Sequence, residues 1–123
     1  MRPLKDRVGH AGEAAALAFV REKGMEVLAR DWRSNLGQID IVAEDGDTLV
    51  LIEVKARRGT GFGLPEEAVD ARKRQKLRTL AEMYRAATKR QKQPVRIDVL
   101  GLILDDKLQV TRTEHIENAV QDE

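Results

Sequence analysis

The chain has 123 residues, a length typical of one domain, with no Cys, two His and only 3% aromatic residues. This composition excludes a disulfide framework, a cysteine-based zinc site and thiol catalysis, and it predicts an aliphatic core. The net charge of +1 conceals an asymmetry, because residues 1–53 carry 7 basic and 10 acidic side chains, residues 54–96 carry 13 and 4, and residues 98–123 carry 2 and 7. The basic central segment indicates either a polyanion-binding surface or only a solvated helix face.

No segment is apolar for long enough to cross a membrane, and the N-terminal residues lack the apolar stretch of a signal peptide. The aliphatic run over residues 99–104 is short enough to be a buried strand. We therefore expect a soluble, cytoplasmic protein without a membrane partner.

The first half of the chain predicts one helix followed by three strands, over residues 9–23, 25–32, 38–44 and 48–56. Gly24 is a typical helix stop, and the second and third strands are joined by a hairpin turn that includes Gly46. The third strand is almost entirely aliphatic, which is typical of a central strand covered on both faces.

The second half predicts a long helix followed by two more strands. Residues 57–64 contain three Gly and are expected to form a loop. Pro65 suits the first position of a helix that runs to about Thr88. Strands over 95–104 and 108–113, and then a short polar helix or tail, complete the chain.

The element order α-β-β-β-α-β-β indicates an α+β (mixed α/β) fold, in which helices flank a mixed central sheet. No linker of domain-dividing composition interrupts it. We therefore expect a single domain over residues 1–123, with its core at about 9–104 and a C-terminal strand and polar tail over 105–123.

Two acidic residues, Asp40 and Glu53, fall on strand positions that can share one face of the sheet. The hairpin between their strands decides whether they meet. A turn at residues 45–46 makes them diagonal neighbours, a turn at residues 46–47 places them directly opposite, and a three-residue loop would separate them. With either two-residue turn, the carboxylates are within reach of one cation.

Two carboxylates on a half-buried face repel each other and lose hydration, so they need a positively charged partner. Oxygen ligands without His or Cys suit Mg²⁺ or Mn²⁺. The alternative is an internal salt bridge to Lys55, which lies on the same strand face as Glu53. Spacing alone leaves both interpretations open.

Three further charged residues occupy positions on the predicted apolar faces of the helices. Glu13 heads the apolar stripe of the first helix. Lys73 lies on the inward stripe of the second long helix, and Lys76 lies near its border. A lysine in such a position can also snorkel, with its stem on the core and its amine in water.

In chain order, Glu13, Gly37-Gln38-Ile39-Asp40, Glu53-Val54-Lys55 and Lys73 resemble the motifs of the PD-(D/E)XK nuclease superfamily. Over about residues 9–104, the chain is more closely similar to the small, uncharacterised bacterial YraN-like family, whose relatives are archaeal Holliday-junction resolvases. The resemblance implies a restriction-endonuclease-like core with the order α-β-β-β-α-β.

By that resemblance, Asp40, Glu53 and the main-chain carbonyl of Val54 would hold Mg²⁺ or Mn²⁺. Lys55 would orient the attacking water or help to deprotonate it. Glu13 would assist through a water molecule or a second metal ion.

Gln38 stands where the related family usually carries Glu, and its side-chain carbonyl could still bind a metal ion or its amide could hydrogen-bond a ligand. Asp98 also matches a family position and is interpreted as structural, paired with Arg96 or a neighbouring strand. Lys73 would touch the scissile phosphate. DNA contacts are expected from five basic side chains within residues 54–96, namely Arg57, Arg58, Arg72, Lys73 and Lys76.

The leading hypothesis is a metal-dependent DNA endonuclease that acts on branched or recombination intermediates. The alternatives are a non-catalytic nucleic-acid-binding module that keeps the fold, and an adaptor that docks repair proteins through its acidic C-terminal segment. Resolvase-like relatives act as dimers, but the sequence indicates no dimer surface, so it does not decide between a monomer and a homodimer. No phosphate-binding loop motif is present, and Ser34 is the only Ser, so a Ser-His-Asp enzyme is excluded.

Overall fold

A computed structural model describes residues 3–59 and 70–120. Its elements follow the predicted order α-β-β-β-α-β-β. They are α1 (Leu4–Glu22), β1 (Glu26–Ser34), β2 (Gly37–Asp45), β3 (Thr48–Arg58), α2 (Ala71–Ala87), β4 (Val95–Leu104) and β5 (Val110–Ile116). Neither of these helices combines the length and the apolar character that crossing a bilayer requires.

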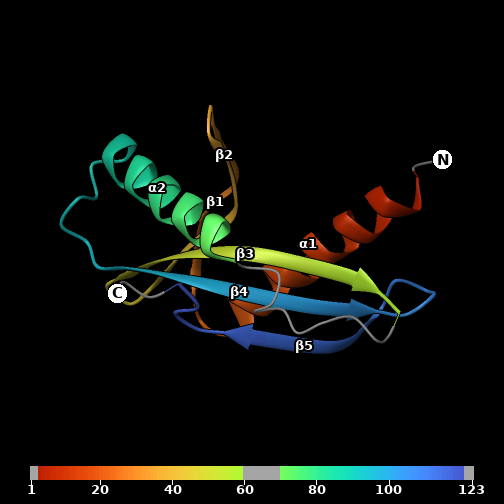
Figure 1. The fold of residues 1–123 in the computed structure, drawn as a ribbon. Helices are drawn as coiled ribbons and strands as arrows, with labels where there is room; N and C mark the ends of the chain where they lie inside the picture. The colour runs from red at the N-terminus through yellow and green to blue at the C-terminus, as the bar shows by residue number, and fades with distance from the viewer. Residues whose placement is uncertain (1–2, 60–69, 121–123) are drawn as a thin grey trace.

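The strands form one five-stranded sheet in the order β1-β2-β3-β4-β5 (Figure 1). Neighbours are antiparallel except β3 and β4, which are parallel. A parallel pair needs a crossover connection, and α2 lies within that connection. Side chains of α1 pack on one face of the sheet and side chains of α2 on the other. The expected α+β class, with a mixed sheet flanked by helices, is confirmed.

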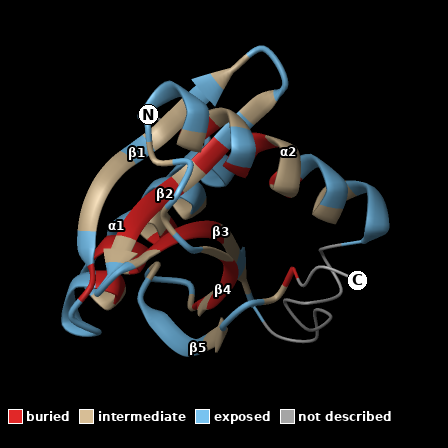
Figure 2. Ribbon diagram, turned by 90° about the vertical axis from the view of Figure 1, so that its left-hand side faces the viewer, coloured by how far each residue is buried: buried red, intermediate tan, exposed pale blue. Residues whose placement is uncertain are grey.

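The core consists of two aliphatic clusters, one on each face of the sheet. In β3, Leu49 and Leu51 pack with residues of α2, while Val50 and Ile52 pack with residues of α1, and all four are buried. Burial follows β2, β3 and β4 through the middle of the molecule (Figure 2). This arrangement confirms β3 as a central strand covered on both faces.

The first helix is longer than predicted at its N-terminus. It begins at Leu4 rather than at Gly9, with Pro3 as the preceding residue. A single Gly inside a helix costs only about 1 kcal/mol relative to Ala, so Gly9 does not interrupt it. The helix ends before Gly24, whose φ of 87° marks the predicted stop.

The second helix begins later than predicted. Asp70 has an extended backbone, and its side chain accepts a hydrogen bond from the amide of Lys73, which is the geometry of an N-cap. The helix therefore begins at Ala71, and the predicted continuous helix from Pro65 is wrong at Asp70. Residues 60–69, which include the predicted Pro start, lie outside the described part of the chain.

Four of the strands also differ from the prediction at their ends. β1 covers Glu26–Ser34 rather than residues 25–32, and β2 extends one residue beyond residues 38–44 at each end. β3 continues to Arg58, into the segment 57–64 that was expected to be a loop, because it stays paired with β4 along this length. β5 begins at Val110, since the φ of 61° at Leu108 lies outside the strand region. It continues to Ile116, so a polar helix or tail directly after residue 113 is wrong.

The hairpin between β2 and β3 has a two-residue turn that begins at Gly46. The φ of Gly46 is 59°, as type I′ and II′ turns require at their first central residue. Ile41 pairs with Ile52, which fixes the register. Of the two registers left open by the sequence, this is the one that sets Asp40 opposite Glu53.

β2 does not keep one alternation along its whole length. Ile41 and Ala43 pack in the cluster on the α1 side and Val42 in the cluster on the α2 side, as the period of two predicts. However, Ile39 also packs on the α2 side, together with Val42. A regular strand would place Ile39 on the same face as Ile41, so β2 changes face at Asp40.

Two Gly residues of α1 give opposite predictions for substitution by Ala. A Cβ on Gly12 would overlap the Cβ of Ala56 on β3, whereas a Cβ on Gly9 would meet no atom within 4 Å. We expect Gly12→Ala to lower the free energy of unfolding by about 1–3 kcal/mol through overpacking. We expect Gly9→Ala to raise it by up to about 1 kcal/mol through helix propensity. Urea denaturation checks both values, and equal losses in the two variants would contradict a close helix–sheet contact at Gly12.

Candidate active site

The candidate site lies where β2 separates from β3. Paired residues of these strands end with Ile41 and Ile52. Beyond them, the amide of Val54 donates to Oδ2 of Asp40 at 2.8 Å rather than to the main chain of β2. Asp40 therefore completes the hydrogen bonding of β3 at the point where the two strands part.

The β1 residue opposite Asp40 is also irregular. Asp31 has a φ of 49°, in the left-handed region that Asp tolerates better than most residues. At this point the hairpin of β1 and β2 bends towards α2 (Figure 1). Trp32 then stacks edge to face on Tyr84, with 5.4 Å between the ring centroids. The bend brings the hairpin tip against α2 and opens a space beside β3.

The side chain of Asp40 has a hydrogen-bond donor on each oxygen, yet it resists ionisation. Gln38 Nε2 donates to Oδ1 at 3.2 Å, and the amide of Val54 donates to Oδ2. Burial, and then the carboxyl group of Glu53 within hydrogen-bonding reach, raise the pKa of Asp40 to about 6. The two carboxyl groups therefore meet, as the hairpin register implies, and the ionisation of Asp40 is opposed by the charge of Glu53.

Glu53 is the more deeply buried member of this pair, with 9% of its side chain exposed. Lys73 Nζ, on α2, lies 2.9 Å from Glu53 Oε2. This ion pair is the one contact with a cation that Glu53 makes within residues 3–59 and 70–120. The salt bridge to Lys55 that the sequence left open is wrong, because the lysine that reaches the pair is Lys73.

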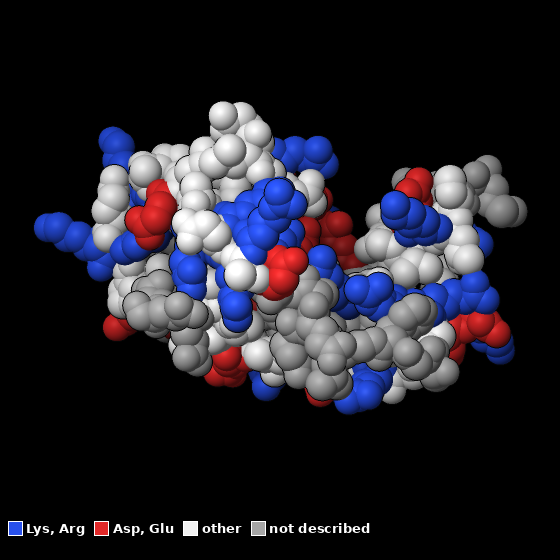
Figure 3. Space-filling model, viewed as in Figure 1, with Lys and Arg blue, Asp and Glu red and all other residues white. Residues whose placement is uncertain are grey.

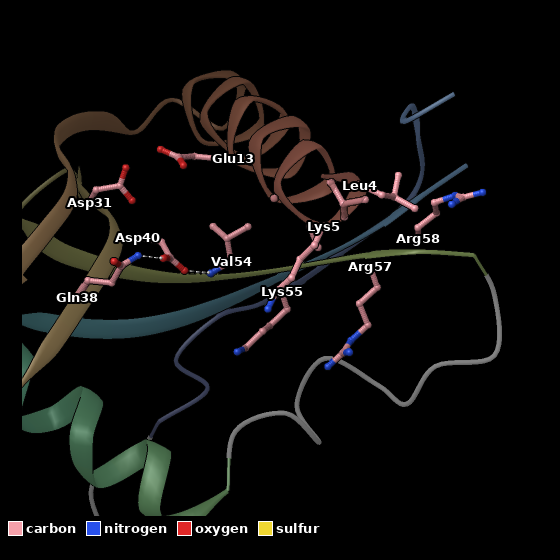
Figure 4. A pocket seen from close by; sticks show the side chains of 13 residues that line it. Leu4, Lys5, Glu13, Asp31, Gln38, Asp40, Val54, Lys55, Arg57 and Arg58 are labelled. Atoms are coloured by element: carbon pink, nitrogen blue, oxygen red, sulfur yellow. Dashed lines mark hydrogen bonds between the residues drawn. The ribbon is translucent and has the colours of Figure 1, made fainter. Parts of the chain in front are cut away.

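Asp40 and Gln38 line two cavities. The larger, of about 740 Å³, lies between the N-terminal half of α1 and the end of β3. The smaller, of about 400 Å³, lies between the hairpin tip and α2 and is also lined by Glu53 and Lys73. In the larger cavity the carboxylates lie at one end and the basic side chains lie towards the other (Figure 4). The carboxylates are those of Glu13, Asp31 and Asp40, and the basic side chains are those of Lys5, Lys55, Arg57 and Arg58.

Of the four residues expected to be catalytic, the structure brings Asp40 and Glu53 together. Glu13 Oε1 pairs with Arg30 Nη2 at 3.4 Å and lines the larger cavity from α1. Lys55 lines the same cavity from β3. Within residues 3–59 and 70–120, no three acidic or His side chains are grouped to hold one metal ion, so Glu13 lies apart from the carboxylate pair.

The five residues expected to contact DNA divide between the two cavities. Lys73 and Lys76 line the smaller cavity. Arg57 and Arg58 line the larger one, and Arg72 is exposed at the start of α2. On the face drawn in Figure 3, Lys and Arg side chains border a hollow between α2 and α1 in which acidic side chains are visible.

The Gly of the Gly37-Gln38-Ile39-Asp40 segment makes room for Lys76. Gly37 has a φ of 146°, and a Cβ there would lie 2.7 Å from Lys76 Cε and 3.1 Å from Lys76 Nζ. A larger residue would therefore push the Lys76 side chain away from the smaller cavity. The glycine shapes the site as well as the turn.

Sequence reasoning did not identify Asp31, Arg33 or Lys5 as residues that line these cavities. Arg33 reaches the smaller cavity only because the hairpin bends towards α2, and Lys5 reaches the larger one only because α1 begins at Leu4. The one available signal was Asp31 itself, since Asp is disfavoured inside a strand and often marks an irregular backbone.

Asp98 is buried and fully satisfied. Its carboxylate contacts Arg96 Nε at 3.1 Å, His115 Nε2 at 2.8 Å and the amide of Asn118 at 2.9 Å. The structural interpretation of Asp98, with Arg96 as its partner, is confirmed. Asp98 also shows what a compensated buried carboxylate looks like in this protein.

The chain matches a known protein family over most of its length. Residues 12–102 match the Uncharacterised protein family UPF0102. A UPF0102 protein from Nocardia farcinica is 43% identical over 100 residues, covering 81% of this chain and 79% of that protein. Another from Pelotomaculum thermopropionicum is 38% identical over 119 residues, covering 97% and 99%.

Among solved structures, a chain of the "Structure of EndoMS-dsDNA2 complex" superposes with a TM-score of 0.43 and 20% identity, covering 76% of this chain and 35% of that one. The family match and the relatives confirm the YraN-like resemblance that the motifs indicate: the chain belongs to the UPF0102 family.

Proposed function

We propose that the protein is a metal-dependent nuclease that hydrolyses DNA phosphodiester bonds at Asp40 and Glu53, with branched, recombination or repair intermediates as its substrates. The observation that carries this proposal is the meeting of two carboxyl groups, those of Asp40 and the buried Glu53, with Lys73 as the one cation in ion-pair contact with them among the described residues. A structural acid in this protein is compensated, as Asp98 is. Two carboxyl groups that share one ammonium group, that of Lys73, keep a net negative charge when both are ionised, and this charge suits a divalent cation.

The oxygen donors of the pair fit Mg²⁺ or Mn²⁺, which prefer carboxylate and carbonyl ligands. Asp40 and Glu53 would be the charged ligands. The main-chain carbonyl of Val54 and the side-chain carbonyl of Gln38 are the neighbouring neutral oxygens on β3 and β2. When bound, the ion would polarise the phosphodiester and lower the pKa of a water molecule.

Residues around the pair would position that water and the phosphate. Lys55, on the wall of the larger cavity, would orient the water or receive its proton. Glu13 would accept a hydrogen bond from water on the α1 side of the same cavity. Lys73 and Lys76, in the smaller cavity, would neutralise phosphate oxygens.

The charge distribution supports DNA as the substrate. The two cavities meet at Asp40, and each carries basic side chains away from that point, with Arg33 in the smaller and Arg57 in the larger cavity. A strand that crossed both cavities would place phosphates beside these cations and one phosphate at the carboxylates. Acids beside phosphates oppose binding unless a cation neutralises them, which favours an enzyme over a non-catalytic binding module.

A cleavage assay tests this function on labelled four-way-junction, duplex and single-stranded DNA with Mg²⁺ or Mn²⁺. Wild type should cut at least one substrate, and Asp40→Ala should reduce the rate about 10³-fold or more because metal catalysis contributes several kcal/mol. Glu26→Gln is the control, since it removes one negative charge from the exposed start of β1 and should retain cleavage.

Calorimetry with Mn²⁺ and the salt dependence of DNA binding separate the alternatives. Mn²⁺ should bind wild type and fail to bind Asp40→Ala, and unchanged binding in that variant would contradict the metal site. DNA affinity should fall steeply with salt. The logarithm of the binding constant should fall by about 0.9 per phosphate contact for each tenfold rise in salt concentration. DNA binding without cleavage would favour the binding module, and a flat salt profile would favour a protein adaptor.

A further inference from the structure

Lys73 is already engaged with a carboxylate at the site where it is expected to bind phosphate. Its Nζ lies 2.9 Å from Glu53 Oε2, and 29% of its side chain is exposed. Its amide donates to Oδ1 of Asp70 at 2.9 Å, so the N-cap of α2 fixes the backbone from which this side chain extends. Lys73 therefore approaches the carboxylates from a defined point and keeps a path to solvent.

We propose that Lys73 is an internal counter-ion that a divalent metal ion displaces, and that the released ammonium group then binds a DNA phosphate, so that metal and DNA bind cooperatively through this one residue. The inference rests on the proposed function, because it takes Asp40 and Glu53 as the metal ligands. It adds a coupling between the two ligands that the site assignment alone does not contain.

Charge balance is the first argument for this exchange. Without a metal ion, two carboxyl groups share one nearby ammonium group, at 2.9 Å from Glu53. A divalent ion on the pair supplies two positive charges within a few ångströms of Nζ. The attraction that holds Lys73 then becomes a repulsion between like charges in a poorly solvated place, which favours its release.

The surrounding space is the second argument. Lys73 lines the smaller cavity, of about 400 Å³, together with Lys76 and Arg33. Its ammonium group can therefore leave Glu53 without entering the core. Once released, it joins two other cationic side chains around a cavity of ample size for a phosphate group, and a phosphate is the anion that this proposed enzyme brings there.

Lys76 provides a matched comparison. It lies three residues further along α2 and lines the same cavity, but it is exposed and has no carboxylate partner within the described residues. Its charge is available to phosphate whether or not a metal ion is bound. The two lysines therefore differ in whether a carboxylate holds them, and only the charge of Lys73 would be released by a metal ion.

The test is DNA affinity measured with EDTA and with Ca²⁺, which takes the same kind of oxygen ligands as Mg²⁺. A gel confirms that the DNA stays intact. Lys73→Met should bind DNA like wild type in EDTA and about tenfold more weakly than wild type in Ca²⁺, since one charged contact is missing. Lys76→Met should lose a similar factor in both conditions. In wild type, Ca²⁺ should also make the salt dependence of DNA binding steeper, by the amount that corresponds to about one more phosphate contact. In Lys73→Met, Ca²⁺ should leave this salt dependence unchanged.

Equal losses of Lys73→Met in EDTA and Ca²⁺, or no loss in either, would overturn the exchange. Because removal of Lys73 leaves Glu53 without a cation, Lys73→Gln serves as a second variant that keeps an N–H donor, and it should show the same pattern. If Mn²⁺ fails to bind wild type in calorimetry, the proposed function itself fails. If Ca²⁺ binds wild type and not Asp40→Ala, an equal loss in Lys73→Met rejects only the exchange.

Discussion

Glu53→Gln is expected to abolish Mn²⁺ binding and to lower DNA cleavage by about three orders of magnitude or more, while the chain stays at least as stable as wild type at pH 7. The side chain keeps its shape but loses its charge, which removes the repulsion with Asp40 that burial intensifies. Lys73, the partner that is left, is partly exposed and can reach water. Calorimetry with Mn²⁺, the cleavage assay and urea denaturation measure the three quantities.

The matched control is Asp98→Asn, the same chemical change at the other buried carboxylate. Asp98 accepts from Arg96 and Asn118 and contacts His115, so the loss of its charge leaves donors facing a weaker acceptor. Breaking such a buried pair costs about 3–5 kcal/mol. A loss of stability in Glu53→Gln as large as in Asp98→Asn would mean that the Glu53–Lys73 contact is structural.

The features of the fold that follow local patterns could be predicted from the sequence. The aliphatic run of β3 indicated a central strand, and Gly46 indicated a tight hairpin turn with one of two registers. The start of α2 could not be predicted, because two start signals compete. Pro65 suits a first helical turn, but the described helix begins after Asp70, whose carboxylate accepts a hydrogen bond from the amide of Lys73.

The candidate site was predictable only where it depends on one hairpin. The two-residue turn fixes the register that brings Asp40 and Glu53 to the same end of the hairpin, and their carboxyl groups meet just beyond the last paired residues, Ile41 and Ile52. The lysine that faces them could not be predicted in this way. Lys55 shares a strand with Glu53, but Lys73 reaches it from α2, and only the tertiary packing of that helix decides between them.

The bend of β2 is a second feature that the sequence pattern could not predict. The change of face at Asp40 accompanies the left-handed backbone of Asp31 on the neighbouring strand, and no alternation of polar and apolar residues encodes it. Both cavities nevertheless lie beside that bend, and Arg33 lines the smaller one. The site is therefore located where the sheet departs from the regular geometry that sequence periodicity can report.

Asp40→Asn is expected to become more stabilising, relative to wild type, as the pH rises from about 4 to about 7. The pKa of Asp40 is raised from its ordinary value of 3.8 to about 6, with burial as the main cause and Glu53 as the next. The folded chain therefore holds this proton more tightly than the unfolded chain, and wild type loses stability as the pH rises through this window. This loss in the free energy of unfolding amounts to about 3 kcal/mol, and Asp40→Asn avoids it because Asn carries no charge at any pH.

Urea denaturation of wild type and Asp40→Asn at several pH values measures this difference, since titratable groups that do not interact with Asp40 contribute equally in both proteins. If the stability difference between the two proteins were the same at pH 4 and at pH 7, Asp40 would ionise normally.

The same raised pKa predicts that Mn²⁺ affinity of wild type falls about tenfold per pH unit below pH 6 and levels off above it, because the metal ion must displace a proton. Ionised Asp40 lowers the stability of the folded chain, and a divalent cation that binds only this form would restore it. A rise of the melting temperature with Mn²⁺ at pH 7, absent in Asp40→Asn, would therefore link the instability of the pair to its proposed ligand.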